Sequence, residues 1–496
     1  MRDKADRASD GPTFPGGLEG GTFRPLTEAD VKRIHEATVE VLSEVGFEVH
    51  SQQALDLFKQ TDIRYDESKG VARVPEKTLM ELVGRAPKEV VLYGREERHD
   101  LHLGGKRVYF GPGGTALNML DIQTGTCRRA QLKDLIDVIR LVDKLDHVHF
   151  MLLPTYPNEL PQERVDVNRF FAGLMYTTKH VMGGVYTSEG IDRVIAMAEQ
   201  VAGSPEALRE RPFISMITCG ISPLRLDGKY GDFMIQVARA GIPVSVPSEP
   251  MCGATSPVTL AGNLLIQNCD TLINVLTAQL ARPGAPLLCG SVATSTDLRD
   301  LKYLGGSVES GLINAGAAQM AQFYGLPYYA TAGISDSKTI DVQCGYEAAI
   351  NNLMVGLAGA NFIHDAAGLM EFAMTVCLEK YVTDNEILGM AMRAIKGIEV
   401  NDESLAMKTI RKVGPAGNFV GARHTRRYMR TEHYVPTLSD RDSRNDWEKK
   451  GSIDALQRAS GIVQEILGAE ASPILEAGMR SRLLEAFPEI AKEHYQ

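Results

Sequence analysis

The chain has 496 residues, of which 44% are hydrophobic and 6% aromatic, and its formal net charge is −10. This length allows one large domain with additions, and the acidic balance excludes nucleic acid as a partner because phosphate binding needs a basic face. The sequence has no run of about eighteen apolar residues, so no membrane span is expected. The N-terminus has no apolar signal region and the seven cysteines form no C-x-x-C pair, which predicts a cytoplasmic protein with reduced thiols.

The N-terminal part is predicted to contain an arm and a small α+β addition. Residues 1–24 are rich in glycine, proline and charge, which predicts a mobile arm. Thr27 is predicted to cap a helix that keeps an apolar stripe and ends at Gly46. Residues 25–106 are assigned to the addition, which leads into the main domain.

From residue 107 to residue 370 the sequence repeats a strand–helix unit. The segments between the strands keep helical apolar spacing, as in Leu132–Ile139, and strands such as Phe213–Ile217 are apolar throughout, as parallel strands covered on both faces must be. These features predict a (β/α)8 TIM barrel. The alternative is a doubly wound open sheet, which usually has fewer strands and a glycine-rich fingerprint. The predicted strands begin near Val108, Val148, Val181, Phe213, Val244, Leu287, Tyr328 and Phe362.

Residues 371–496 are predicted to form a mainly helical addition that packs on the barrel. Glu371–Ile410 has a helical pattern, and a polar segment rich in glycine and proline follows it. An amphipathic helix is expected to close the chain.

The stretch Leu326–Glu347 carries the clearest sign of a functional site. Its apolar run breaks at Gly333, and hydroxyl, charged and amide side chains follow in quick succession. A merely structural loop does not need so many different polar groups, and in a barrel the strand C-termini carry function. Six strand ends are informative in this way: Phe110–Thr115, Leu152–Glu159, Gly183–Glu189, Ser248–Pro257, Ile334–Gln343 and His364–Gly368.

Aromatic side chains gather near these strand ends in a chain that is otherwise poor in aromatics. They indicate an aromatic-lined cavity, which could hold a cation such as a quaternary ammonium. The alternative for each of them is packing between strands and helices. The residues are Tyr109, Phe110, Tyr156, Tyr186, Tyr328 and Tyr329.

Two charged candidates end apolar strands. His364, at the last barrel strand, could anchor a substrate carboxylate or exchange a proton, and a structural role is its alternative. Glu249 stands directly before Pro250, and a loop-bracing role is its alternative.

Metal chemistry is only weakly indicated. Cys219, Cys252, Cys289 and Cys344 lie near strand ends and could converge as thiolate ligands, but small buried cysteines are commoner. Asp100–Gly105 matches D-x-H-x-x-G, by which corrinoid-binding domains offer a histidine to cobalt, yet no Rossmann-like series follows it, so we interpret the match as coincidence.

Four segments carry a resemblance to a known family: Tyr109–Asp121, Ser248–Gly262, Ile334–Glu347 and Gly414–Thr425. From about residue 27 to its C-terminus the chain resembles the trimethylamine:corrinoid methyltransferase family. The resemblance implies a TIM-barrel enzyme that moves a methyl group from an amine to Co(I) of a separate, small corrinoid protein. That partner would dock over the barrel mouth and bring the cobalamin, and no tightly bound metal is expected in this chain.

The archaeal trimethylamine enzymes of this family carry pyrrolysine, and none appears in this sequence. The resemblance therefore implies the non-pyrrolysine branch, whose members demethylate quaternary amines such as glycine betaine, proline betaine and carnitine. When a quaternary ammonium loses a methyl group to Co(I), a neutral tertiary amine leaves. The leaving group needs no proton, so no acid–base catalyst is expected. The site then consists of residues expected to bind substrate, namely Tyr109, Phe110, Tyr156, Tyr186, Glu249 and His364, and residues expected to shape the mouth toward the corrinoid, namely Gly113, Asp336, Lys338 and Gln343.

The substrate carboxylate is expected to meet His364, Arg225 or Lys338. Other functions stay open at this point: the same chemistry on trimethylamine or another methyl donor, a metal-dependent TIM-barrel hydrolase or lyase, or a non-catalytic betaine-binding protein. A homo-oligomer is also possible, although the sequence has no signature of one.

Overall fold

The computed structural model describes residues 14–495 of the chain. It is a mixed α/β fold built on one central sheet with the strand order β1-β7-β19-β18-β15-β14-β12-β11-β10. From β7 to β10 all neighbours in this order are parallel. The parallel strands are β7 (Arg107–Pro112), β10 (Met151–Leu152), β11 (Val181–Gly184), β12 (Ile214–Ile217), β14 (Val244–Ser248), β15 (Leu287–Ser291), β18 (Tyr328–Thr331) and β19 (Phe362–Ala367).

The two ends of this run of parallel strands meet. The backbone N–H of His149, just before β10, donates to the carbonyl of Phe110 in β7 at 2.7 Å. Beyond the strands, Ala116 and Thr155 form a parallel bridge. The predicted strand starts agree with the observed ones to within three residues, because each apolar run is bounded by polar or turn residues.

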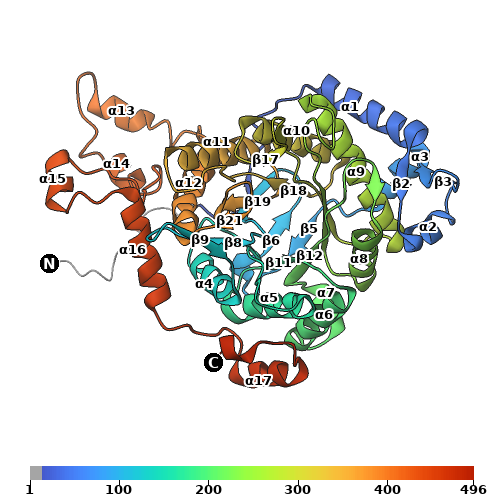
Figure 1. Cartoon of the computed structure of the whole chain (residues 1–496). Helices are drawn as coiled ribbons and strands as arrows, with labels where there is room; N and C mark the ends of the chain where they lie inside the picture. The colour runs from blue at the N-terminus through green and yellow to red at the C-terminus, as the bar shows by residue number, and fades with distance from the viewer. Residues whose placement is uncertain (1–13, 496) are drawn as a thin grey trace.

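Each parallel strand leads to a helix that packs outside the sheet, as Figure 1 shows. Many of these helices begin at a side-chain cap; Thr187, Asp227 and Ser307, for example, each accept a hydrogen bond from the backbone N–H three residues on. The helices are α4 (Leu132–Asp143), α5 (Gln162–Tyr176), α6 (Ser188–Ala202), α8 (Gly228–Ala240), α9 (Leu260–Ala281), α10 (Val308–Tyr324), α11 (Val342–Ala358) and α12 (Leu378–Lys396), and the short α7 (Pro205–Glu210) follows α6. Helix α12 follows the last strand, so the unit expected at residues 107–370 continues to Lys396.

The amino-terminal end of the sheet is filled by apolar side chains. The hairpin of β5 (Val90–Leu92) and β6 (Leu101–Leu103) buries Leu92 and Leu103 against Tyr109, Phe150 and Phe362. Phe150 and Phe362 stack with 3.6 Å between ring centroids. This packing closes one end of the fold, so a ligand must approach from the carboxyl ends of the strands.

The N-terminal region differs in part from the expected mobile arm. Strand β1 (Leu18–Glu19) pairs with β7, and Phe14 is only 3% exposed, so residues 14–24 pack on the body; residues 1–13 lie outside the described part. Thr27 caps α1 (Glu28–Glu40) with a capping box, as predicted, and a π-helical turn, η2 (Val41–Val45), precedes Gly46. The rest of this addition comprises β2 (Phe47–Val49), α2 (Gln52–Phe58), β3 (Arg64–Asp66), β4 (Val71–Arg73), α3 (Glu76–Arg85) and η3 (Glu97–His99).

Short strands rise from the loops that follow the parallel strands. A small sheet joins β8 (Asn118–Asp121) and β9 (Thr126–Arg129) to β20 (Leu369–Met370) and β21 (Thr375–Val376). The hairpin of β16 (Ser295–Asp297) and β17 (Lys302–Leu304) follows β15, and β13 (Arg225–Leu226) pairs with β2. These elements build the walls around the carboxyl ends of the central strands.

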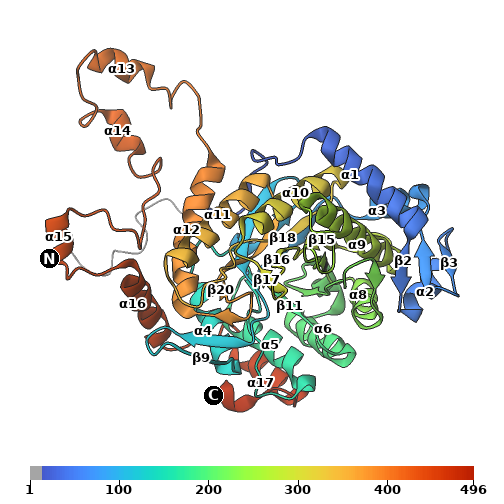
Figure 2. The same cartoon turned by 45° about the horizontal axis from the view of Figure 1, so that its top comes forward.

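The C-terminal helices divide into two groups. Helix α16 (Ala455–Gly468) packs on the body, and the segment with α17 (Ala477–Ala486) and η4 (Lys492–His494) returns to α5, where the Ala491 N–H donates to the Asn168 side chain. In contrast, α13 (Met407–Val413), α14 (Arg423–Tyr428) and α15 (Arg444–Lys449) lie away from the body (Figure 2). None of the helices in residues 14–495 is long and apolar enough to cross a membrane.

Candidate active site

Glu249 directly follows β14 and faces charges from other strands. Its side chain is exposed to solvent, yet the surrounding protein desolvates it and raises the pKa of its carboxyl from 4.5 to about 7. The Asp365 charge adds to this rise, and His364 opposes it. Both properties together are those expected of a carboxyl that water reaches while protein surrounds it. We use "the hollow" only as a name for the neighbourhood of Cys219, Glu249, Tyr303 and Asp365, whose charges act on one another.

Asp365 and His364 form a buried pair in β19. Asp365 has a left-handed backbone, with φ of 59°, and its Oδ2 lies 2.9 Å from His364 Nε2. His364 Nδ1 lies 2.7 Å from the Ala330 carbonyl and must donate to it, so the ring's other nitrogen faces Asp365. The imidazole also stacks on Tyr329, with 4.0 Å between centroids. His364 is thus fully engaged and 2% exposed, which makes it a positioning residue for Asp365 rather than the expected anchor for a substrate carboxylate.

Gly113 leaves the space that the Asp365 carboxylate occupies. A Cβ at this position would overlap Asp365 Oδ1 and the Leu369 side chain. Gly113 is buried against the Asp365 and Leu369 side chains, so it is not exposed as expected for a mouth residue. Asp365 Oδ1 has no hydrogen-bond partner among the described protein groups.

Tyr156 and Tyr186 form an aromatic wall from the neighbouring strands β10 and β11. Their rings are perpendicular, with 5.2 Å between centroids, and both are half-buried. The fully buried Arg169 lies behind them, where it donates to the Leu153 carbonyl at 2.7 Å and to the Tyr186 hydroxyl at 3.3 Å. These contacts fix the ring of Tyr186, so the structure brings the two tyrosine rings together, and their role in substrate binding stays a prediction.

Two residues of the hollow had no substrate-binding role in the sequence analysis. Burial, and then the charges of Glu249 and Asp365, raise the pKa of Cys219 to about 12, so it is a neutral thiol at pH 7. Burial and the same two carboxyls also raise the pKa of Tyr303, in β17, well above its ordinary value. The only sequence signal for Tyr303 is an isolated aromatic in the charged loop after a strand, which does not reveal that this loop folds over the hollow.

Asp336, Lys338 and Gln343 follow β18 at the rim. Burial raises the pKa of Asp336 to about 7, and its Oδ2 accepts from the Gly306 N–H at 3.2 Å. Lys338 is exposed; its Nζ donates to the Asp336 carbonyl at 2.6 Å and lies 4.2 Å from the centre of the Phe372 ring. Gln343 donates to Glu347, which in turn accepts from the Asp336 N–H, so Gln343 braces this loop.

Three predicted residues lie away from the hollow. Tyr109 is buried at the amino-terminal end of the sheet, where its hydroxyl accepts from the His102 N–H. Phe110 points outward and packs under Gly356 of α11. Arg225 pairs with Glu48 at 2.9 Å in the small N-terminal sheet. The expected substrate roles of Tyr109, Phe110 and Arg225 are therefore wrong, the first two because they stand too early in β7 to reach its carboxyl end.

The strand-end cysteines do not form a metal centre. Cys252, Cys289 and Cys344 are buried single thiols, and within residues 14–495 no three histidine, cysteine or acidic side chains converge as metal ligands would. The hydrolase or lyase alternative built on these cysteines consequently has no ligand set in the described chain.

A family model described as trimethylamine methyltransferase (MTTB) matches residues 5–494. The chain belongs to the MTTB family. It is 37% identical over 442 residues to the trimethylamine methyltransferase MttB of Desulfitobacterium hafniense (strain DSM 10664 / DCB-2), covering 89% of each chain. It is 35% identical over 457 residues to the MttB of Methanosarcina barkeri (strain Fusaro / DSM 804), covering 91% of this chain and 92% of that one.

A glycine betaine methyltransferase of Desulfitobacterium hafniense (strain Y51) is also similar, with 31% identity over 472 residues and coverage of 95% of this chain and 98% of that one. The solved structure of the Methanosarcina barkeri monomethylamine methyltransferase (MtmB) matches with a TM-score of 0.48 and 13% identity, covering 91% of this chain and 96% of that one. The predicted family is confirmed, and the MTTB-family chain is an amine:corrinoid methyltransferase.

Gly113→Ala is expected to lower methyl transfer by this MTTB-family enzyme about a hundredfold, because the new Cβ displaces the Asp365 carboxylate from the hollow. The rate of cobalamin methylation measures the loss of activity, and a thermal unfolding curve checks that the variant is folded. Gly84→Ala in α3 is the matched control, since a Cβ there meets nothing within 4 Å. An unchanged rate in Gly113→Ala would show that the position of Asp365 does not matter to the reaction.

Proposed function

We propose that the chain transfers a methyl group from a quaternary amine, with glycine betaine as the first candidate, to Co(I) of a corrinoid carried by a separate protein. MTTB-family methyltransferases use corrinoid proteins as methyl acceptors. The observation that carries the quaternary amine is Glu249, a solvent-accessible carboxyl that lies near Asp365 and Tyr303. Carboxylates and aromatic faces are the groups that attract an ammonium without donating a proton to it.

We further infer that the eight parallel strands form a closed (β/α)8 barrel with the hollow at its mouth. The strand order, the alternation with eight helices and the contacts between β7 and the segment around β10 support this inference. In barrels of this type the active site lies at the carboxyl ends of the strands. The corrinoid partner would then dock over the rim near Asp336 and Lys338, which is the open side.

The residues of the hollow suit the chemistry of this transfer. The methyl carbon passes from nitrogen to cobalt, the C–N electron pair stays on nitrogen, and a neutral tertiary amine leaves. No proton is needed, which fits a site whose Cys219 and Tyr303 keep their protons at neutral pH. The protein's task is to hold one N–CH3 bond toward the mouth between the Tyr156–Tyr186 wall and Glu249, and to limit water.

The substrate loses its positive charge during the reaction, so its attraction to Glu249 is strongest in the ground state. Binding that is too tight there would slow the chemical step. The exposure of Glu249 and the proton that its raised pKa retains near neutral pH both moderate the attraction.

Tyr186→Leu is expected to weaken the binding of a quaternary amine about tenfold, whereas Tyr186→Phe retains most of the affinity, because the aromatic face and not the hydroxyl contacts the cation. Isothermal titration with glycine betaine measures both. Equal losses in the two variants would assign the effect to the hydrogen bond from Arg169 and not to the ring.

Lys338 is our candidate for the carboxylate of a betaine, because it stands at the rim with its ammonium on the Phe372 ring and is exposed. Lys338→Met is expected to raise the KM for glycine betaine about tenfold and to leave the KM for choline, which has no carboxylate, within about twofold. Lys302→Met is the matched control, since this exposed lysine lies 6.0 Å from the same ring and pairs with Asp300. Equal KM changes for both substrates would remove Lys338 from substrate binding.

Trimethylamine is the second candidate substrate, because the two relatives named for it, at 37% and 35% identity, are more similar to this chain than the glycine betaine enzyme at 31%. Its protonated form also fits a hollow with a carboxylate. A parallel titration of glycine betaine and trimethylamine at pH 8 separates the two: saturable binding of the betaine alone supports the proposal, and binding of trimethylamine alone would replace it.

A further inference from the structure

A cavity of about 570 Å³ lies on the outer surface of the fold, between α1, α10 and the segment that follows β1. Helix α1 packs on the outside of α9 and α10, as Figure 1 shows. None of the residues that define the hollow lines this cavity. Its volume suits a small organic ligand.

Hydrogen bonds to the backbone fix one side of the cavity. The Gln319 side chain donates to the Leu26 carbonyl and accepts from the Leu26 N–H, both at 2.9 Å. The N–H groups of Gly21 and Phe23 donate to the Leu357 carbonyl of α11 at 2.7 and 3.1 Å. Residues 21–26 are therefore held against α10 and α11, so the cavity is largely formed before a ligand arrives.

Three cations line the cavity, and each comes from a different part of the chain. Arg24 belongs to the segment after β1, Lys32 to α1, and Lys106 to the turn before β7. Within residues 14–495, Arg24 and Lys106 form no ion pair, and Lys32 reaches only Glu36, at 3.9 Å, where both side chains are exposed. The one acid among the lining residues is Glu28. A positive charge therefore stays uncompensated here, although the whole chain has a net charge of −10.

Two glycines make room for the Lys106 side chain at the cavity. Gly21, with φ of 88°, leaves the space for the lysine stem, since a Cβ there would lie 2.3 Å from Lys106 Cδ. Gly359, with φ of 81°, does the same nearer the backbone, where a Cβ would lie 2.9 Å from Lys106 Cβ. The stem is confined in this way, so the ammonium loses little conformational freedom when it binds an anion.

An aromatic pair forms a further part of the lining. Phe323 of α10 is 48% exposed, and its ring centroid lies 5.1 Å from that of His35 in α1. His35 Nδ1 lies 3.1 Å from the Tyr324 hydroxyl, which orients the imidazole. Next to this pair, Gln322 donates through Nε2 to the Ala358 carbonyl at 2.9 Å, and its Oε1 stays available as an acceptor. An exposed aromatic face beside a free amide oxygen suits a flat ring that carries an N–H group.

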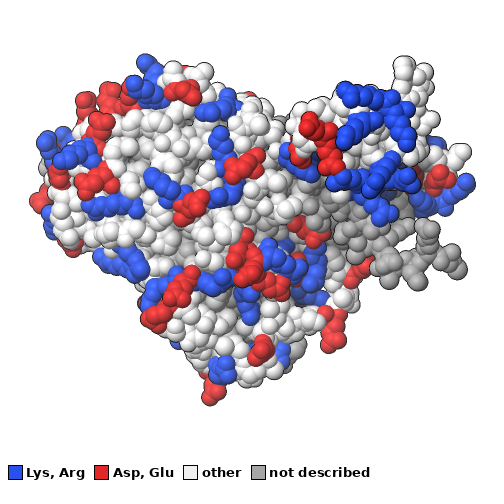
Figure 3. Space-filling model, turned by 180° about the vertical axis from the view of Figure 1, so that it is seen from behind, with Lys and Arg blue, Asp and Glu red and all other residues white. Residues whose placement is uncertain are grey.

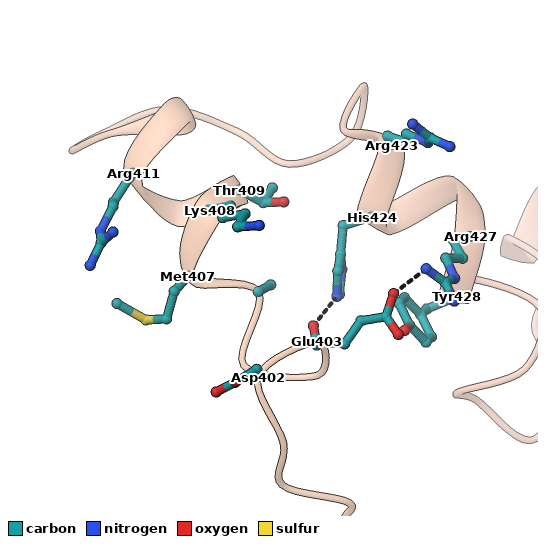
Figure 4. A pocket seen from close by; sticks show the side chains of 11 residues that line it. Asp402, Glu403, Met407, Lys408, Thr409, Arg411, Arg423, His424, Arg427 and Tyr428 are labelled. Carbon is teal, nitrogen blue, oxygen red and sulfur yellow. Dashed lines mark hydrogen bonds and ion pairs between the residues drawn. The ribbon is translucent and has the colours of Figure 1, made fainter.

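Other gatherings of cations on the chain lack this combination. On the face that Figure 3 shows, the lysines and arginines of the body stand among acids, and a cluster of cations marks the segment that carries α13 and α14. The cavity of about 620 Å³ in that segment is shown in Figure 4, where Arg427 pairs with Glu403. Residues 396–437 bury none of their side chains, whereas Val31 and Gln319 at the α1 cavity are 6% and 3% exposed.

We propose that the cavity between α1 and α10 is a second ligand site, for an anion that joins a flat ring to phosphate groups, such as a nucleoside diphosphate. Three cations exceed what a single carboxylate would neutralise, and they match the charge of a diphosphate. The Phe323 ring receives the flat ring, and Gln322 accepts from its N–H group. This site is separate from the hollow and does not rest on the proposed methyl transfer.

Isothermal titration of the full-length protein tests the proposal with adenosine diphosphate, adenosine and pyrophosphate as probes. Adenosine diphosphate is expected to bind once per chain with a dissociation constant below about 100 μM. Adenosine and pyrophosphate are each expected to bind at least about tenfold more weakly, because each offers only one of the two features. No binding of the diphosphate up to about 1 mM, or equal affinity for pyrophosphate, would overturn the proposal.

Two substitutions separate the roles of charge and ring. Lys106→Met is expected to weaken the binding of adenosine diphosphate about tenfold or more. Lys69→Met, which removes an exposed lysine between β3 and β4, is the matched control and retains the affinity. Phe323→Ala is expected to weaken the diphosphate about tenfold and to leave pyrophosphate within about twofold, whereas Phe323→Tyr keeps the ring and the affinity. Circular dichroism checks that each variant is folded, and wild-type affinity in folded Lys106→Met would contradict the proposal.

Photolabelling with an azido derivative of adenosine diphosphate locates the site. Label is expected on peptides that contain residues 24–35 or 319–323, and excess adenosine diphosphate is expected to prevent it. Label confined to the hollow or to residues 396–437 would place the nucleotide elsewhere and overturn the proposal. None of these measurements depends on methyl transfer, so their failure is distinct from a failure of the proposed function.

Discussion

Glu249→Gln is expected to weaken quaternary-amine binding about a hundredfold at pH 8 and to abolish its pH dependence. The substitution keeps the shape of the side chain and removes its charge, and the protein around Glu249 screens that charge less than bulk water does, so its attraction for a cation exceeds that of an ordinary surface pair. The raised pKa of Glu249, about 7, sets the direction of the wild-type pH profile. Below pH 7 the carboxyl holds a proton and loses its attraction for the cation.

Wild-type affinity is therefore expected to fall about tenfold between pH 8 and pH 6, following the ionised fraction of a group with a pKa near 7. A quaternary ammonium has a constant charge, so this change belongs to the protein. Titration calorimetry with tetramethylammonium and glycine betaine measures the profile. The control is Glu465→Gln, which removes an exposed carboxylate on α16 and is expected to keep the wild-type pH profile. A pH-independent wild type, or a pH-dependent Glu249→Gln variant, contradicts the assignment.

The raised pKa of Glu249 also makes the stability of the fold depend on pH. Stability falls as the pH rises, whereas the affinity for a cation increases. A carboxyl whose pKa is higher in the folded than in the unfolded chain stabilises the fold below pH 4.5 and loses that contribution as the pH rises to 7. A bound cation offsets this loss. The thermal shift produced by a betaine is consequently expected to be larger at pH 8 than at pH 6.

Lys380→Met is expected to lower the free energy of unfolding by about 3–5 kcal/mol. Lys380 and Asp384 of α12 form a fully buried pair with 2.7 Å between Nζ and Oδ2. Burial alone would lower the pKa of Lys380, and the Asp384 charge reverses this so that the pKa lies above its ordinary value. Losing the lysine leaves a buried carboxylate without its partner. Urea unfolding at pH 7 measures the change.

The pair also positions the loops of the hollow. Lys380 Nζ donates to the Gly333 carbonyl after β18 at 3.3 Å, and Asp384 accepts from the Gly368 N–H after β19 at 2.8 Å. The double variant Lys380→Met/Asp384→Leu is expected to recover most of the stability and to keep a reduced rate of methyl transfer. A loss of less than about 1 kcal/mol in the single variant contradicts the account of this pair, and a full rate in the double variant contradicts its positioning role.

The strands and helices could be predicted because each is bounded locally. Apolar runs such as Val244–Ser248 and Leu287–Ser291 are set off by glycine, proline or polar residues, and the helices carry caps such as Thr187. The outward position of residues 396–437, which carry α13 and α14, could not be predicted in this way, because a segment that buries none of its residues still has the composition of an ordinary helical addition.

The site was predictable only where position along a strand sufficed. Glu249 follows its strand directly and faces the hollow, whereas Tyr109 and Phe110 stand early in β7, which the sequence pattern does not distinguish from its end. Tyr303 and the contact between Gly113 and Asp365 depend on long-range packing of separate loops. Such convergence is a property of the folded chain and leaves no local pattern.

The most direct measurement follows the absorbance of Co(I)-cobalamin under reducing conditions with the purified protein and, in separate reactions, glycine betaine, proline betaine, carnitine, choline and trimethylamine. The account predicts conversion to methyl-Co(III) with at least one quaternary amine, at a rate that Glu249→Gln lowers and Glu465→Gln does not. Conversion with trimethylamine alone, or no conversion with any quaternary amine, would contradict it.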